Sequence, residues 1–135
     1  MEQEKIGLIV NNAAYDRVSN ALSIANVLAA QLRDVHVFFT YGAIIRLRTG
    51  KADELGKETE NWMLELIKIG LEKDTIPRIS EMLSFSKGFG VKIYACSAAK
   101  KFHDIPEEEL KITDGVIGIS EFLEKVQGAS TILYI

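Results

Sequence analysis

The residue with the clearest chemical potential in this sequence is Cys96, the single cysteine among 135 residues. It follows the apolar segment 91–95 and precedes three small residues, Ser97, Ala98 and Ala99. This pattern predicts a buried strand that ends at the cysteine and runs into a helix. Amide groups at a helix N-terminus favour the thiolate, which is the reactive form of cysteine. Since there is no second cysteine, any chemistry of this sulfur must involve a small molecule or another protein.

The residues after the cysteine are predicted to form an anion-binding site. The amides of Ser97, Ala98 and Ala99 would point at the sulfur, because the first helical turn offers them no internal acceptors. Lys100, four residues after the cysteine, could add positive potential. Such a site could stabilise a thiolate, a persulfide or the sulfonate end of thiosulfate. The alternative is a structural cysteine in a core strand, since cysteine is among the most buried residue types.

Four further residues are candidates for the wall of a binding pocket. Asn11, Asn12 and Tyr15 follow the first predicted strand, and Tyr41 follows the second. Each could donate a hydrogen bond to a bound molecule, although asparagine is also an ordinary turn residue after a strand.

The two histidines are expected to lie outside this site. His103 is seven residues past Cys96, about 10 Å away along a continuous helix, which is too far for a cysteine–histidine dyad. His36 starts a strand and receives no role. One cysteine and two histidines give no recognisable metal-binding spacing. The sequence also lacks a G-x-G-x-x-G motif, a Walker A lysine and a C-x-x-C pair, so we predict neither a cofactor nor a thioredoxin-like activity.

The composition indicates a single globular domain over residues 1–135. Hydrophobic residues make up 47% and charged residues 26% of the chain. The net charge of −3 gives no electrostatic basis for nucleic-acid binding. No apolar run approaches the roughly 18–20 residues of a membrane span, and the apolar start of the chain is too short for a signal peptide. A lone cysteine without an export signal is expected in the cytoplasm, where thiols stay reduced.

Strands alternate with helices along the chain, which predicts an α/β fold with an open, mostly parallel sheet. The expected strands are 6–10, 35–40, 91–95, 116–117 and 130–135. The expected helices cover about 16–32, 43–47, 58–72, 75–88, the residues after Cys96, 104–109 and 120–127. The commonest solution for five strands is the order 2-1-3-4-5. That order would place strands 1 and 3 side by side, with Asn11-Asn12 and Cys96-Ser97 at one crevice.

Two features predict contacts with other subunits. The helix around Trp62–Leu71 is apolar over most of its circumference, so it should lie deep in the core or face another subunit. Trp62 and Met63 are therefore assigned to packing rather than to a lid. The final strand has no helix after it, and an exposed sheet edge requires protection that oligomerisation can supply.

Several segments together resemble the DsrE/DsrF-like family of sulfur-relay proteins. The sharpest is the stretch from Gly90 to Ala99, which combines an apolar strand, a cysteine and small residues. Residues 105–110 (IPEEEL), the strand end 38–42 (FFTYG) and the terminal 131–135 (TILYI) also fit. The resemblance covers most of the chain in the order of its elements.

The resemblance implies a flavodoxin-like, three-layer α/β/α fold, often assembled as trimers or hexamers. It also implies that Cys96 accepts a sulfane sulfur, as a persulfide or thiosulfonate, and passes it to a partner such as a TusA-like carrier or another protein thiol. The hypothesis is therefore a cytoplasmic sulfur carrier or sulfurtransferase. Two alternatives remain open: a non-catalytic assembly subunit of a sulfur-metabolism complex, and a protein that binds a flavin or nucleotide.

Overall fold

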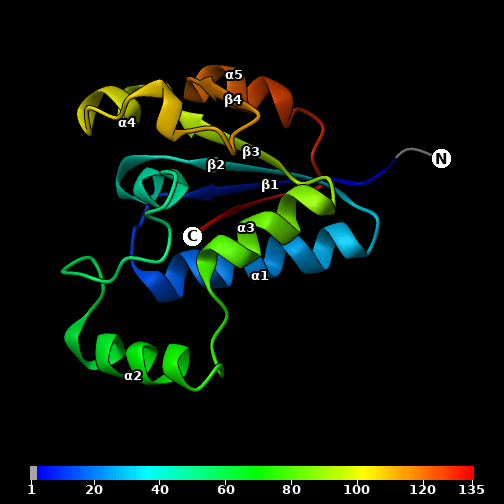
Figure 1. Cartoon of the computed structure of the whole chain (residues 1–135). Coiled ribbons are helices and arrows are strands. Elements are labelled where there is room, and N and C mark those ends of the chain that lie inside the picture. Colours follow the sequence, from blue (N-terminus) through cyan, green and yellow to red (C-terminus); the bar gives the residue numbers. More distant parts are fainter. Residues whose placement is uncertain (1–2) are drawn as a thin grey trace.

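Residues 3–135 are described by a computed structural model in which strands and helices alternate (Figure 1). The strands are β1 (Lys5–Val10), β2 (Asp34–Phe39), β3 (Lys92–Cys96), β4 (Gly115–Ile117) and β5 (Thr131–Tyr134). The α-helices are α1 (Tyr15–Ala30), α2 (Asn61–Glu72), α3 (Ile79–Gly88), α4 (Ser97–Phe102) and α5 (Ile119–Lys125). Two 3-10 helices, η1 (Tyr41–Leu47) and η2 (Glu107–Glu109), complete the set. The predicted elements are thus present, with ends shifted by a few residues.

The sheet has a different strand order from the predicted one. Its order is β4-β3-β2-β1-β5, and every neighbouring pair is parallel. The predicted order 2-1-3-4-5 is therefore wrong, and the sheet is wholly rather than mostly parallel. β2 lies between β1 and β3, so the strands that end at Val10 and Cys96 are not adjacent.

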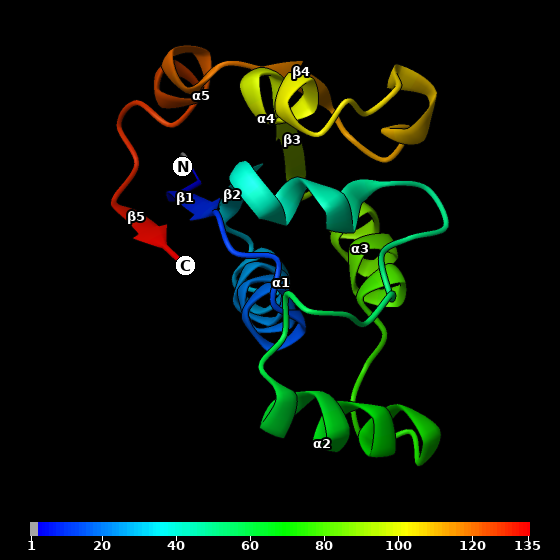
Figure 2. The ribbon, with the colours of Figure 1, turned by 90° about the vertical axis from the view of Figure 1, so that its left-hand side faces the viewer.

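The direction of each chain crossing explains which face each helix covers. The chain steps from β1 to β2 to β3 in one direction, so right-handed crossovers place α1 and α3 on the same face. From β4 the chain returns across the sheet to β5 beside β1, and α5 lies on the opposite face (Figures 1 and 2). The predicted layered α/β architecture is confirmed in this arrangement.

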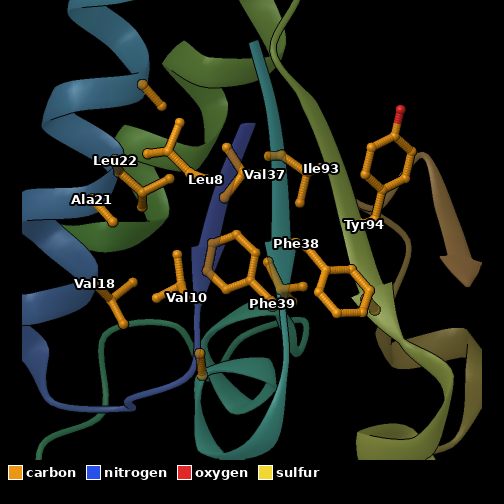
Figure 3. Packing of buried hydrophobic residues seen from close by; sticks show 14 of the residues in the cluster. Leu8, Val10, Val18, Ala21, Leu22, Val37, Phe38, Phe39, Ile93 and Tyr94 are labelled. Carbon is orange, nitrogen blue, oxygen red and sulfur yellow. The ribbon is translucent and has the colours of Figure 1, made fainter. Parts of the chain in front are cut away.

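The strands are buried on both faces, as expected of a parallel sheet covered by helices. Leu8, Val37 and Ile93 point towards α1, whereas Phe38 and Tyr94 point to the other side (Figure 3). On that second side Phe122 of α5 stacks on Phe38, with ring centroids 4.9 Å apart. The alternation places the side chain of Cys96 on the same face as that of Tyr94, two residues earlier.

The helix α2 stands away from the sheet and the other helices (Figures 1 and 2). Ile67 and Gly70 are buried on its inner side, while Trp62, Leu66 and Ile69 are exposed. The exposed residues follow an i, i+4, i+7 spacing and so form one apolar stripe. The first of the two predicted positions, deep in the core, is therefore wrong for α2. The second, a contact of this stripe with another subunit, stays a prediction. Within residues 3–135, no helix is both long and apolar enough to cross a membrane.

Candidate functional site

Cys96 is the last residue of β3 and the N-cap residue of α4. The strand holds its backbone through parallel pairing with Ile117 of β4. Its residue exposure is 7%. The thiol is therefore shielded from bulk solvent, and its access to other molecules depends on the space next to it.

That space is a partly open cavity of about 500 Å³. Its floor consists of Ile9 of β1, Phe38 of β2 and Cys96. These three side chains share the face of the sheet that α5 covers, because they alternate in register along neighbouring strands. The thiol thus lines an opening whose volume lies in the ordinary range for small-molecule sites.

The rim of the cavity is formed by exposed apolar side chains. Tyr41, Phe102 and Tyr134 are 69%, 79% and 68% exposed, and Ile119 at the start of α5 is half exposed. Thr40, Ala98 and Ala99 complete the wall. The lining as a whole joins residues from Ile9 of β1 to Tyr134 of β5.

Tyr41 adopts a backbone conformation that non-glycine residues rarely adopt. Its φ angle is 46°, in the left-handed region. The Nε2 of His103 donates a hydrogen bond to the Tyr41 carbonyl over 3.0 Å, which ties α4 to the start of η1. Such conformations cost about 1–3 kcal/mol and are concentrated at ligand sites. His103 therefore acts on the rim through a backbone contact, not on the thiol.

The cavity is chemically neutral apart from the thiol. Among residues 3–135, no charged side chain lines it. Its polar lining residues, apart from Cys96, are Thr40, Tyr41 and Tyr134, and the hydroxyl of Tyr134 accepts a hydrogen bond from Nδ2 of Asn11. In the same described part of the chain, no group of three histidine, cysteine or acidic residues is arranged to hold a metal ion. The cavity therefore places one thiol beside a mostly apolar lining.

Five of the nine residues predicted from the sequence gather at this cavity. Cys96, Ala98, Ala99 and Tyr41 line it. Asn11 touches its rim through the hydroxyl of Tyr134. Most of the residues that line this cavity beside the thiol are apolar or aromatic.

The other four predicted residues lie outside the cavity lining. Ser97 and Lys100 belong to α4 but do not border the open space. Asn12 accepts a hydrogen bond from the amide of Ala14 over 2.8 Å, as an ordinary turn residue does. Tyr15 is fully buried, and its hydroxyl donates to the Pro77 carbonyl and accepts from the Ile79 amide.

Arg46 forms a second polar centre near the end of β1. It is 1% exposed, and its guanidinium lies over the ring of Tyr15. It donates to the carbonyls of Ala13 and Ala52 and to the carboxylate of Glu58, at 3.0, 3.1 and 2.8 Å. A further bond goes to the carbonyl of Glu54. These contacts fix the irregular segment 48–60 to the turn after β1.

The comparison with known families covers nearly the whole chain. The sequence profile of the DsrE/DsrF-like family matches residues 4–135. The chain belongs to the DsrE/DsrF-like family. The predicted resemblance is thus confirmed, and the family is associated with sulfur relay.

Solved structures share the fold of this DsrE/DsrF-like protein. The YchN protein of E. coli matches with a TM-score of 0.73 and 17% identity, over 98% of this chain and 100% of its own. MTH1491 of Methanobacterium thermoautotrophicum, described as a protein of unknown function, matches with a TM-score of 0.69 and 16% identity, with the same coverage. At such identities the likeness shows the fold alone. A search of curated proteins finds no match.

Sequence reasoning missed most of the apolar residues that shape the cavity of this DsrE/DsrF-like protein. The sequence gives a partial indication that Phe102 and Tyr134 are exposed, because each is an aromatic residue at the edge of a polar or terminal segment. Nothing in the sequence assigns Ile9 and Phe38 to the cavity, since each lies in a run of apolar residues that points to both faces of the sheet. Their shared wall follows from the register of β1 with β2, which the sequence pattern does not specify.

Proposed function

We propose that this protein is a sulfur carrier that accepts a sulfane sulfur on Cys96 and passes it to a thiol of a second protein. The observation that carries the proposal is the position of its single cysteine in the wall of a partly open cavity. Membership of the DsrE/DsrF-like family, which is associated with sulfur relay, supports it. A reducing compartment such as the cytoplasm would keep the thiol available.

The transfer requires two balanced exchange steps. In the first, the Cys96 thiolate attacks the sulfane sulfur of a donor R–S–SH, the donor S–S bond breaks, and R–S⁻ leaves. Cys96 then carries a persulfide, Cys96–S–SH. In the second, the thiolate of the acceptor protein attacks the outer sulfur, and Cys96 returns to its thiolate. Neither step needs an oxidant, because the sulfane sulfur and its oxidation level move together.

Three features of the cavity support this role. Its open side gives a donor a path to a cysteine that is otherwise 7% exposed. Its rim of exposed aromatic residues offers a surface on which an acceptor such as a TusA-like carrier could dock. The small side chains of Ala98 and Ala99 leave room beside the sulfur.

Intact-protein mass spectrometry tests the proposal directly. The protein is incubated with inorganic polysulfide, with thiosulfate and with an organic trisulfide, and the gain of sulfur is measured before and after treatment with a reductant. We expect an adduct on Cys96 that the reductant removes, and none in Cys96→Ser. Transfer is then followed as a mass shift from the loaded protein to a small acceptor protein. The absence of an adduct with all three donors would disprove the proposal.

We also propose that the protein assembles into a homo-oligomer through the apolar stripe Trp62, Leu66 and Ile69 of α2. Helix α2 stands away from the rest of the subunit (Figure 2). The three side chains of the stripe are exposed, and exposed apolar patches mark association surfaces. Sedimentation velocity of the wild type and of Leu66→Arg tests this. A monomeric wild type would contradict it, whereas a monomeric variant beside an oligomeric wild type would support it. An assembly role of this kind is compatible with sulfur transfer.

A further inference from the structure

The lining of the Cys96 cavity restricts which sulfur donors can reach the thiol. Its floor contains Ile9 and Phe38, and its rim contains Phe102, Ile119 and two tyrosine rings. In the part of the chain that the structure describes, the lining offers no cationic side chain to pair with an anion. Its few hydroxyl groups are spread over the strand ends, and one of them is already engaged by Asn11.

An anionic donor would lose its hydration on entering such a space. Burial of a charge is costly unless an opposite charge or several hydrogen bonds replace the lost water. Thiosulfate carries two negative charges, and this lining offers it no such replacement. Transfer of hydrocarbon groups into the same space is favourable in free energy, because apolar surface of both the ligand and the cavity wall is removed from water.

We propose that the cavity binds the apolar arms of a neutral organic polysulfide, of which an organic trisulfide is the simplest form. This inference rests on the proposed sulfur-carrier function and specifies its donor. The cavity of about 500 Å³ is large enough for a drug-sized apolar ligand. The rim of the cavity contains the exposed aromatic rings of Tyr41, Phe102 and Tyr134. These rings can bind aromatic arms by stacking and aliphatic arms by dispersion contacts.

The proposed reaction balances without a further reagent. The Cys96 thiolate attacks the central sulfur of R–S–S–S–R. A new S–S bond forms between Cys96 and that sulfur, the bond to one arm breaks, and R–S⁻ leaves and takes a proton from water. Cys96 then carries Cys96–S–S–S–R, in which the central atom is the sulfane sulfur. An acceptor thiolate that attacks this atom releases the Cys96 thiolate.

A comparison of donors tests the proposal. The rate of adduct formation on Cys96 is measured by mass spectrometry with dibenzyl trisulfide and with thiosulfate. Each rate is divided by the rate at which the same donor reacts with N-acetylcysteine, which removes differences in intrinsic reactivity. We expect the normalised rate to be at least tenfold higher for the trisulfide. Equal rates, or a preference for thiosulfate, would overturn the assigned donor class and leave the carrier function intact.

Matched phenylalanine variants connect the preference to the cavity. Phe102→Ala removes an exposed ring from the rim, and Phe85→Ala removes a 63% exposed ring from α3, outside the cavity. We expect the normalised trisulfide rate to fall at least threefold in Phe102→Ala and to be unchanged in Phe85→Ala. A similar effect of both variants would contradict a specific site at the cavity.

A binding measurement separates this inference from the carrier function. Cys96→Ser cannot react, and dibenzyl sulfide has no S–S bond to break, so their association reports the cavity alone. We expect saturable binding to Cys96→Ser by calorimetry, weakened by a second change, Phe102→Ala. No binding would overturn the inference, whereas the lack of any Cys96 adduct with every donor would overturn the carrier function itself.

Discussion

At the carboxyl edge of the sheet, the segment after β1 is closed by hydrogen bonds, whereas the segment after β3 borders an open apolar cavity. After β1, the amide of Tyr15 donates to the hydroxyl of Thr59, and Arg46 binds the carbonyl of Ala13. After β3, Cys96 lines the open apolar cavity. The two regions occupy equivalent positions in the fold but present opposite chemistry.

This contrast separates stability from reactivity. A buried polar cluster whose groups are all hydrogen-bonded stabilises the folded state. Loss of one member leaves its partners without hydrogen bonds and lowers the free energy of unfolding. Cys96 lies at the edge of the core and also lines an open apolar cavity, and the proposed function assigns it a reactive role there. Changes at the first region should therefore alter the free energy of unfolding, and changes at the second should alter thiol chemistry.

The largest expected effect is the loss of sulfur loading in Cys96→Ser. The variant lacks the only thiol of the chain, so no adduct should form with any donor. Its free energy of unfolding should change by about 1 kcal/mol or less, since the substitution changes one buried atom. Mass spectrometry and urea denaturation measure the two quantities. A variant that unfolds would show that the thiol is mainly a core group.

Arg46→Ala should have the opposite profile. It removes the cation that faces Glu58 and the donor for several carbonyls, so we expect a loss of about 3 kcal/mol in stability. The alkylation rate of Cys96 by iodoacetamide under native conditions should stay within twofold of the wild type. Arg46→Lys serves as a control that retains the charge but not the planar donor group, and it should recover part of the stability. A large change in the alkylation rate would show that the two regions are coupled.

Tyr15→Phe should also lower stability without changing thiol chemistry, but its effect on stability should be smaller than that of Arg46→Ala. The hydroxyl of Tyr15 joins α1 to the start of α3, as donor to Pro77 and acceptor from Ile79. Its removal leaves both backbone groups without this partner, and we expect a loss of about 1–2 kcal/mol by denaturant unfolding. Sulfur loading should be unaffected. A reduced loading rate would assign Tyr15 to the reactive region, as the sequence had suggested.

The smallest expected effect concerns Asp114, which anchors β3 at the end opposite Cys96. Partial burial disfavours its ionised form, but hydrogen bonds from Lys87 and the Ile93 amide outweigh this and hold its pKa below the usual 3.8. A carboxyl whose pKa is lowered by folding stabilises the folded state above its unfolded pKa, and this contribution disappears as the pH falls through the folded pKa. Asp114→Asn should therefore be less stable than the wild type at pH 7.

The difference in stability between Asp114→Asn and the wild type should shrink as the pH falls below about 4. Urea unfolding at pH 7, 5, 4 and 3 measures it. Lys87→Gln is the matched control, because it removes the partner and retains the carboxyl. A difference that stays constant with pH would show that the ionised carboxylate is not the stabilising species.

The sequence predicted the elements well because their signals are local. The apolar run at Ile6–Val10 and the 3.6-residue periodicity of α1 each lie within one segment. Strand order depends on which distant segments pair, and β2 is apolar on both faces, so its pattern does not identify its neighbours. For this reason the adjacency predicted for β1 and β3 was wrong.

The candidate site was predicted in part for a related reason. A cysteine between an apolar run and three small residues marks a strand–helix junction, so the position of Cys96 followed from adjacent residues alone. The apolar character of the cavity depends on Phe38 and Tyr134, which reach it only through the register of β2, β1 and β5. Arg46 lies among apolar residues of η1, and nothing in the sequence indicates its carbonyl partners.

The cavity contains residues from Ile9 in β1 to Tyr134 in β5. It is therefore complete only late in folding, when the first and last strands have paired. Long-range strand pairing is a slow part of folding. Until β5 pairs with β1, the thiol lacks the part of its enclosure that Tyr134 supplies. A newly made chain would therefore carry its thiol before the cavity that surrounds this thiol is complete.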